Sequence, residues 1–163
     1  MKPISFFVQG EPKAQPRPRA FARRMGDKFV ARVYTPGTAE AWKSAIAEAA
    51  RPFVGTGRRM IDEPIAVSLT FVLPRPKAHY LSGNRLRSNA PMFHSIKPDC
   101  DNLAKSTTDP LKTIGLIADD SLIVQLEVTK LYTMGQRIGA QIEIREPSNP
   151  FRVEGTGERF SIF

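Results

Sequence analysis

Apolar residues recur along the chain with two different periods, and each period predicts a type of secondary structure. Apolar and polar side chains alternate most clearly from Ile65 to Leu73, which predicts a strand. Similar runs predict strands over Ile4–Val8, Lys28–Tyr34, Leu122–Tyr132 and Ile138–Ile144, the second of them at a sheet edge. A turn separates the last two runs, so we expect these strands to form an antiparallel hairpin.

Two other segments show the helical period. Trp42 and Ile46 share one face of a helix predicted over about Thr38–Arg51. A second helix is predicted over Asn102–Ile114, where a glycine follows the last helical residue. The order of strands and helices predicts an α+β fold, in which a mixed β-sheet packs with two helices in a single domain.

Two segments fit neither period. Prolines alternate with basic residues from Glu11 to Arg24, which predicts an extended basic arm rather than a helix or a central strand. Pro74–Lys97 shows no periodicity, and connections of this length are usually functional or mobile. The chain has 163 residues, of which 41% are hydrophobic, and this is enough for one core. We therefore place one domain at residues 1–146 and a C-terminal tail at 147–163.

The formal charge of +8 and the sequence pI of about 10.0 predict an anionic partner, most simply nucleic acid. Basic residues dominate Met1–Tyr34, and the stretch Pro64–Pro98 contains no acidic residue. The alternative is a basic solvated surface, and charge alone does not distinguish DNA from RNA or acidic lipid. The candidate DNA-binding residues are Lys13, Arg17, Arg19, Arg23, Arg24, Arg75, Lys77, Arg85, Arg87 and Lys97.

Cysteine and histidine are too sparse to predict a zinc site. The single cysteine, Cys100, cannot form a disulfide within the chain, and we expect it to be a small packed side chain. His79 and His94 lie in the long segment without periodicity, where we expect exposed loop residues rather than metal ligands. No apolar run approaches the roughly 18 residues of a membrane span, and no signal peptide is visible. We therefore expect a soluble, cytoplasmic protein.

The acidic residues in the middle of the chain gather in one short stretch. The first two, Asp99 and Asp101, fall at the predicted start of the second helix. Lys105 follows Asp101 one helical turn later and on the same face. The last two, Asp119 and Asp120, directly precede the next strand. The sequence leaves open whether the chain after the helix returns toward the helix start.

Each of these acidic residues has a purely structural interpretation. Asp101 could cap the helix, or it could pair with Lys105 for about 0.2–0.5 kcal/mol. Asp119 and Asp120 could form a turn. Converging carboxylates are also the usual protein ligands of Mg²⁺, which activates water and stabilises the leaving oxygen in phosphodiester hydrolysis. This functional interpretation accounts better for an acidic cluster in a chain of charge +8.

The sequence DCDNLAKSTTDPL, followed by GLIADDS, resembles the core of the RusA-type Holliday junction resolvases of phages and prophages. The similarity extends to PKAQPRPR near the start and to RVYTP before the first helix, and it covers most of the chain. The resemblance implies that Lys105 is a catalytic residue near the scissile phosphate. The catalytic metal ligands that it implies are Asp99, Asp101 and Asp120.

Asp109 and Asp119 match further family positions and are candidate supporting residues. Pro110 departs from the family pattern, because it leaves the Ser106 carbonyl without its helical partner and should kink the helix. The resemblance implies a homodimer that binds a four-way DNA junction and nicks two opposed strands, with Mg²⁺ as cofactor and Mn²⁺ as a substitute. Two alternatives stay open: a non-catalytic basic nucleic-acid-binding protein, and a generic metal-dependent nuclease.

Overall fold

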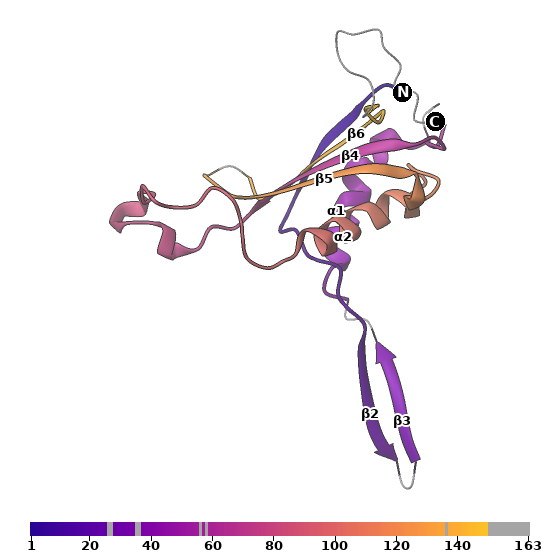
Figure 1. Ribbon diagram of the computed structural model, residues 1–163, viewed down its shortest axis with the longest axis horizontal. Coiled ribbons are helices and arrows are strands. Elements are labelled where there is room, and N and C mark those ends of the chain that lie inside the picture. Colours follow the sequence, from indigo (N-terminus) through magenta and orange to yellow (C-terminus); the bar gives the residue numbers. More distant parts are fainter. Residues whose placement is uncertain (26–27, 35–36, 56, 58, 136, 150–163) are drawn as a thin grey trace, which may run out of the picture.

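The computed structural model describes residues 1–25, 28–34, 37–55, 57, 59–135 and 137–149 (Figure 1). In this part of the chain, a four-stranded mixed sheet carries two α-helices on one face. The helices are α1 (Glu40–Ala50) and α2 (Cys100–Thr113). The strands lie in the order β1 (Ile4–Gln9), β6 (Gly139–Arg145), β4 (Ile65–Leu73) and β5 (Ile123–Tyr132). This arrangement confirms the predicted α+β fold with a mixed sheet and two helices.

β4 occupies an inner position of the sheet and explains the strand order. It pairs with β5 in parallel and with β6 in antiparallel orientation; Leu69, for example, lies opposite both Val128 and Ile142. Almost every β4 side chain is buried, including Ala66 and Val72 on the face away from the helices. A strand buried on both faces is favoured inside a sheet, where both of its edges form hydrogen bonds. The predicted hairpin of the last two strands is therefore wrong, because β4 lies between β5 and β6.

The core lies between the sheet and the two helices. Its fully buried side chains include Phe71 of β4, Ile46 of α1 and Leu103 of α2. The helices are also joined to each other, since the indole Nε1 of Trp42 donates to Thr107 Oγ1 at 3.3 Å. Burial of one such large apolar side chain stabilises the fold by about 1.5–3 kcal/mol. This layer therefore fixes α2, which carries several of the candidate site residues, against the sheet.

Both helices agree with the predicted segments apart from their ends. α1 begins at Glu40 and is followed by a 3₁₀ turn, η1 (Arg51–Phe53). α2 begins two residues earlier than predicted, with Asp99 at the N-cap position. It continues through the buried Pro110 and ends one turn later. The proline therefore does not interrupt the helix.

The basic arm near the N-terminus forms a second, two-stranded sheet that projects from the body of the molecule (Figure 1). β2 (Arg19–Met25) pairs antiparallel with β3 (Lys28–Tyr34). The arm is extended, as predicted, but the sequence analysis did not predict that its second half forms the strand β2. Pairing is possible there because the last proline before β2 is Pro18 and every residue of β2 retains its backbone donor. The predicted strand β3 is confirmed, but its partner is β2 and not the edge of the main sheet.

The long segment between β4 and α2 contains two short 3₁₀ helices, η2 (Lys77–His79) and η3 (Ser82–Asn84). Near its end, a β-bridge between Phe93 and Leu131 adds the segment to the edge of β5. A further 3₁₀ helix, η4 (Asp120–Leu122), directly precedes β5. Among the described residues, no helix combines the length and the apolar character that crossing a membrane requires.

We expect Gly139→Ala to disrupt the pairing of β1 with β6. Gly139 has a φ of +158°, and a Cβ there would lie 2.0 Å from the Val8 carbonyl oxygen and 2.7 Å from Phe7 Cζ. Such overpacking should lower the free energy of unfolding by about 1–3 kcal/mol beyond the cost of the backbone conformation. The matched control is Gly135→Ala, because φ is +101° there and no atom lies within 4 Å of the added Cβ. Chemical denaturation that finds the two variants equally stable would contradict the predicted clash.

Candidate active site

The N-terminal end of α2 presents two of the predicted metal ligands, Asp99 at the N-cap position and Asp101 in the first turn. We call this pair the acidic end of α2. Both residues are exposed, as is Cys100 between them, so the expectation that this cysteine packs inside is wrong. The Asp99 carbonyl oxygen accepts from the Leu103 N–H at 3.1 Å, whereas its carboxylate makes no capping hydrogen bond. The backbone of Asp99 therefore begins the helix, and the alternative role of Asp101 as the cap is wrong.

The third predicted ligand, Asp120, lies at the other end of α2. Lys112 Nζ, in the last helical turn, approaches Asp119 Oδ2 at 2.5 Å and Asp120 Oδ1 at 3.3 Å. The helical rise places Lys112 roughly 16 Å beyond Asp101 along the axis. The chain after α2 therefore does not return to the helix start. In the described part of the chain, no three His, Cys, Asp or Glu side chains lie close enough together to hold a metal ion.

Lys112 is a charged group of this region that the sequence analysis missed. Its hydrogen bond to Asp119 is the main reason why the pKa of the Asp119 carboxyl lies well below its ordinary range. The Ser121 N–H adds to this effect, because it donates to Asp119 Oδ1 at 3.0 Å. In return, hydrogen bonds to the two aspartates raise the pKa of Lys112. The bond from Ser121 confirms the turn interpretation of Asp119. The sequence signal that could have identified this ion pair is a lysine in the last helical turn, followed closely by two acidic residues.

Lys105 pairs with Asp109, with Nζ and Oδ1 3.4 Å apart, and not with Asp101 as the structural alternative supposed. Asp101 therefore has no ion-pair partner among the described residues. The Lys105 side chain is 60% exposed, and an exposed pair of this kind contributes about 1 kcal/mol or less. Its ammonium can therefore leave Asp109 for a phosphate oxygen at little cost.

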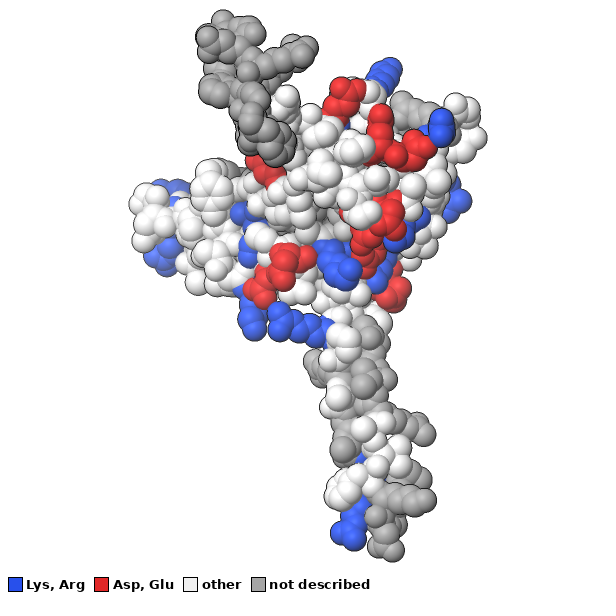
Figure 2. Space-filling view, turned by 45° about the vertical axis from the view of Figure 1, so that its right-hand side comes forward, with Lys and Arg blue, Asp and Glu red and all other residues white. Residues whose placement is uncertain are grey.

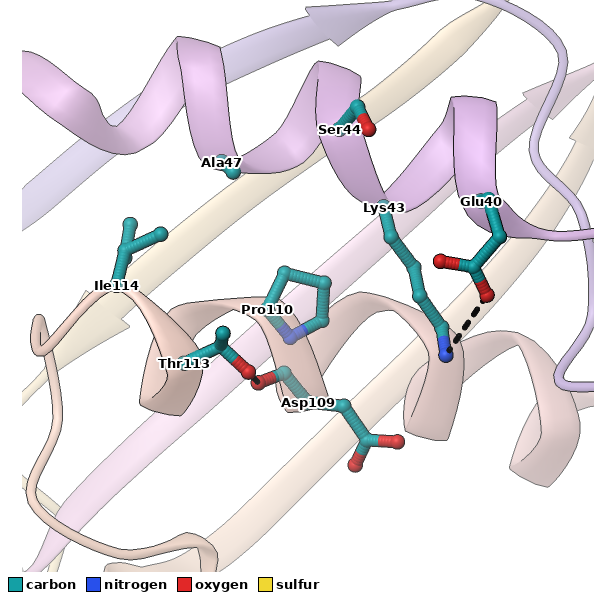
Figure 3. A pocket seen from close by; sticks show the side chains of 8 residues that line it. All are labelled: Glu40, Lys43, Ser44, Ala47, Asp109, Pro110, Thr113 and Ile114. Atoms are coloured by element: carbon teal, nitrogen blue, oxygen red, sulfur yellow. Dashed lines mark hydrogen bonds and ion pairs between the residues drawn. The ribbon is translucent and has the colours of Figure 1, made fainter.

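Asp109 also borders a cleft of about 310 Å³ between α1 and α2 (Figure 3). Thr113 Oγ1 donates to the Asp109 carbonyl oxygen at 3.0 Å, and on the α1 side Lys43 lies 3.8 Å from Glu40. The remaining lining residues are Ser44, Ala47, Pro110 and Ile114. The acidic end of α2 does not line this cleft, so the two sites are separate.

The long segment 74–98, which we call the loop arm, is held against the end of β5 by an arginine and an aromatic ring. Arg75 Nε donates to the Thr133 carbonyl oxygen and Arg75 Nη1 to the Pro91 carbonyl oxygen, both at 2.8 Å. The guanidinium carbon lies 5.1 Å from the centre of the Tyr132 ring, a cation–π distance. These contacts join the start of the loop arm to its later part at Pro91 and to the end of β5.

The histidines of the loop arm differ from the expectation of exposed loop residues. His94 is only 7% exposed, and its ring centre lies 4.6 Å from that of Tyr132. His79 is half-buried and meets the same tyrosine edge-on at 5.0 Å. Burial, and after it the charge of Lys130, lowers the pKa of His94. Packing against the Tyr132 ring therefore explains why both histidines are at least partly buried.

The cationic residues of the loop arm divide into two groups. Arg75 and Arg87 hold the arm itself, the latter through a bond of 3.0 Å from Nε to the Ala78 carbonyl oxygen. The other group is exposed to solvent, and the loop arm contains no acidic residue. This group consists of Lys77, Arg85 and Lys97, and Arg87 is exposed as well, although its Nε holds the arm. These exposed cations are the part of the loop arm that can approach a polyanion.

The second basic segment, residues 11–34, is the hairpin arm, and it is joined to the first half of α2. The Gln15 N–H donates to the Asn102 carbonyl oxygen at 2.8 Å, and Ser106 Oγ donates to the Lys13 carbonyl oxygen at 2.6 Å. The loop arm leads directly into the same end of α2. Both arms therefore leave the molecule beside the acidic end (Figure 1). Figure 2 shows acidic and basic side chains side by side where the hairpin arm meets the body.

The candidate DNA-binding residues of the hairpin arm are mostly exposed. The side chain of Arg19 lies outside the described residues. The others are exposed along the outer part of the arm and at its base, which agrees with a role in binding a polyanion. They are Lys13, Arg17, Arg23 and Arg24.

We expect Lys112→Met to raise the pKa of Asp119 toward its ordinary value, which an NMR titration can follow. A carboxyl whose folded pKa is depressed adds stability above its ordinary pKa of about 3.9, and this stability is lost as the pH falls through the folded pKa. The variant should therefore be less stable than the wild type at neutral pH, and the difference should shrink in acid. Lys43→Met removes a different lysine–carboxylate pair, on α1, and is the control. An unchanged titration of Asp119 would contradict the importance of this ion pair.

Known proteins match this chain over most of its length. The family described as Endodeoxyribonuclease RusA matches residues 9–145, which include both arms, α2 and the strands after it. The chain is also 30% identical to the uncharacterized protein YqaN of Bacillus subtilis (strain 168) over 153 residues, which covers 89% of this chain and 97% of that protein. RusA enzymes are endodeoxyribonucleases that act on Holliday junctions, a branched DNA substrate, and they generally depend on divalent metal. On this evidence the chain belongs to the RusA endodeoxyribonuclease family.

Proposed function

We propose that the protein resolves four-way DNA junctions as a homodimer, by paired symmetric nicks that require Mg²⁺. The observation that carries this proposal is the position of the acidic end of α2 at the base of two basic arms. Exposed cations on both arms would attract the DNA backbone and fix its position. The phosphodiester between them would then lie beside the carboxylates that are proposed to bind the metal.

The proposed ligands of the metal ion are Asp99, Asp101 and Asp120. These residues supply carboxylate oxygens alone, which is the donor type that Mg²⁺ prefers and that Mn²⁺ also accepts. When bound, the metal would lower the pKa of a water molecule and neutralise charge on the phosphate. The acidic end of α2 is free of ion pairs among the described residues, so its carboxylates are available for this role.

Lys105 is the proposed cation at the scissile phosphate. It follows Asp101 by one helical turn on the same face, so a phosphate beside the acidic end lies within its reach. Asp109 would hold the Lys105 ammonium before DNA binds, through the pair at 3.4 Å. Asp119 would have the same supporting role for Lys112.

The proposed dimer follows from the separation of the ligands. Asp120 and the acidic end lie at opposite ends of α2, so a single ion held by all three aspartates needs a second chain. If two α2 helices lay antiparallel across a two-fold axis, the acidic end of each would meet Asp120 of the other. Two such sites, related by the same axis, would match opposed strands of a four-way junction.

β5 offers an uncovered apolar surface for this contact. It is an edge strand of the main sheet, and Val124 and Leu126 are 56% and 50% exposed. Leu126 lies opposite the core residue Val67, which places it on the helix-bearing face of the sheet. Apolar side chains exposed beside a helix are favourable sites for burial against another protein surface.

The arms supply the proposed contacts to DNA phosphates, which would recognise the junction by its shape more than by its base edges. In the loop arm these contacts come from Lys77, Arg85, Arg87 and Lys97, which are exposed, while Arg75 acts by fixing the arm. In the hairpin arm they come from Lys13, Arg17, Arg19, Arg23 and Arg24. The domain boundary after residue 146, the tail at 147–163 and a cytoplasmic location stay predictions; residues 150–163 lie outside the described residues.

The protein should convert a plasmid with an extruded cruciform into linear DNA in the presence of Mg²⁺, and leave the same plasmid without the cruciform almost intact. Asp120→Asn should lose this cutting and keep or increase its affinity for a synthetic junction, because it removes a charge that repels phosphate. Equal cutting of plain duplex would favour a generic metal-dependent nuclease. Binding without nicks at any metal concentration would favour a non-catalytic nucleic-acid-binding protein.

A mixing experiment distinguishes a shared metal site from a site within one chain. If the site is shared, a mixed dimer of Asp101→Asn and Asp120→Asn chains contains one doubly substituted site and one intact site. The mixture should therefore nick the cruciform plasmid after subunit exchange, although each variant alone is inactive. Mixing Asp99→Asn with Asp101→Asn is the matched control, since every site then keeps one substitution. An inactive first mixture would argue against ligands shared between chains.

A further inference from the structure

We infer that Lys130 is a positioning residue for the acidic end of α2. Its side chain holds the chain segment directly before Asp99 and keeps a positive charge close to the two carboxylates. This inference rests on the proposed function, because it assigns Lys130 a role at the candidate active site. It adds to that site a residue from β5, a strand that carries none of the predicted metal ligands.

Lys130 lies near the end of β5, opposite a buried residue of β4, so its side chain extends from the helix-bearing face of the sheet. Its Nζ donates to the Ile96 carbonyl oxygen at 2.8 Å and to the Pro98 carbonyl oxygen at 2.7 Å. The second of these carbonyl groups directly precedes Asp99 in the chain. The main chain adds another link, since the His94 N–H donates to the Lys130 carbonyl oxygen at 3.0 Å. Lys130 therefore anchors the end of the loop arm where it becomes α2.

The charge of Lys130 is not neutralised by a carboxylate in the described part of the chain. Its two hydrogen-bond acceptors are neutral carbonyl groups, whereas aspartates engage both Lys105 and Lys112. The charge also contributes, after burial, to the lowered pKa of His94 in the loop arm. A half-buried ammonium, bonded to the carbonyl group directly before Asp99, therefore lies at the start of α2.

This arrangement suits a residue that prepares the acidic end for its ligands. Asp99 and Asp101 repel each other until a cation binds, and a fixed ammonium nearby reduces that repulsion. The two bonds also restrict the backbone of Asp99, whose carbonyl oxygen begins the hydrogen bonding of α2. Replacing a residue that orients metal ligands without binding the metal itself commonly changes metal affinity or activity by about 10–100-fold.

The test compares Lys130→Met, which removes charge and donors at similar length, with Lys130→Arg, which keeps both. Hydrogen exchange of the peptide spanning residues 94–103, without DNA or metal, measures whether Lys130 holds this segment. Single-turnover cutting of the cruciform plasmid and metal-free binding to a synthetic junction measure its role at the site. Lys43→Met serves as the control, because Lys43 lies on α1 in a different ion pair.

We expect Lys130→Met to accelerate exchange in residues 94–103 and to reduce the cutting rate by roughly tenfold or more. Junction affinity should change much less than the cutting rate, and Lys130→Arg should restore most of both readouts. Unchanged exchange with an unchanged rate would overturn the inference, as would equal losses of binding and cutting that Arg does not rescue. If Lys130→Met fails to fold, Lys130→Gln, which keeps a donor and loses the charge, gives the same comparison. If the wild type does not cut junctions, the proposed function fails, and exchange still decides whether Lys130 holds Asp99.

Discussion

The parallel pairing of β4 with β5 determines where every candidate functional group lies. Parallel strands can be joined only by a connection that crosses from one end of the sheet to the other. Here the connection consists of the loop arm and α2, and the helix returns along the sheet in the direction opposite to the strands. The acidic end therefore lies at the carboxyl ends of β4 and β5, and Asp120 lies where β5 begins. Ligands of open sheets with parallel strands bind at the carboxyl ends, where this protein places its basic arms.

The charges of α2 follow the same division. At the acidic end, the carboxylates have no ion-pair partners among the described residues and lie at the positive end of the helix dipole. At the other end, Lys112 engages Asp119 and Asp120. The free carboxylates would repel DNA, while the exposed cations of the arms would attract it. A metal ion bound between carboxylate and phosphate would remove that repulsion, so metal and DNA would each favour the binding of the other.

Periodicity was sufficient to predict the strands of the main sheet and the helices, because it reports which side chains face the core. It did not predict strand pairing: the short turn after β5 favoured a hairpin, whereas burial of β4 on both faces placed it between β5 and β6. Lys130 is a second case. It occupies a position on the helix-bearing face, in an alternating series with Leu126, Val128 and Tyr132, where a half-buried charged side chain needs hydrogen-bond acceptors. The sequence motif identified the aspartates of the site. Their division between the two ends of α2 depends on the crossover connection from β4 to β5, which a local sequence pattern does not predict.

The division of the proposed metal ligands between the two ends of α2 would restrict which DNA the protein can cut. A chain that held a complete metal site could cut any phosphodiester that its arms attract, including those of plain duplex. If the ligands are shared as proposed, a single chain has no complete site, and assembly of the dimer creates two sites together. Each acidic end must then be correctly oriented before its partner's aspartate arrives, because neither chain can correct the geometry alone. The bonds from Lys130 and from the hairpin arm to the start of α2 supply that rigidity within one chain. Rigid half-sites joined across a two-fold axis would make cutting depend on a substrate with the same symmetry.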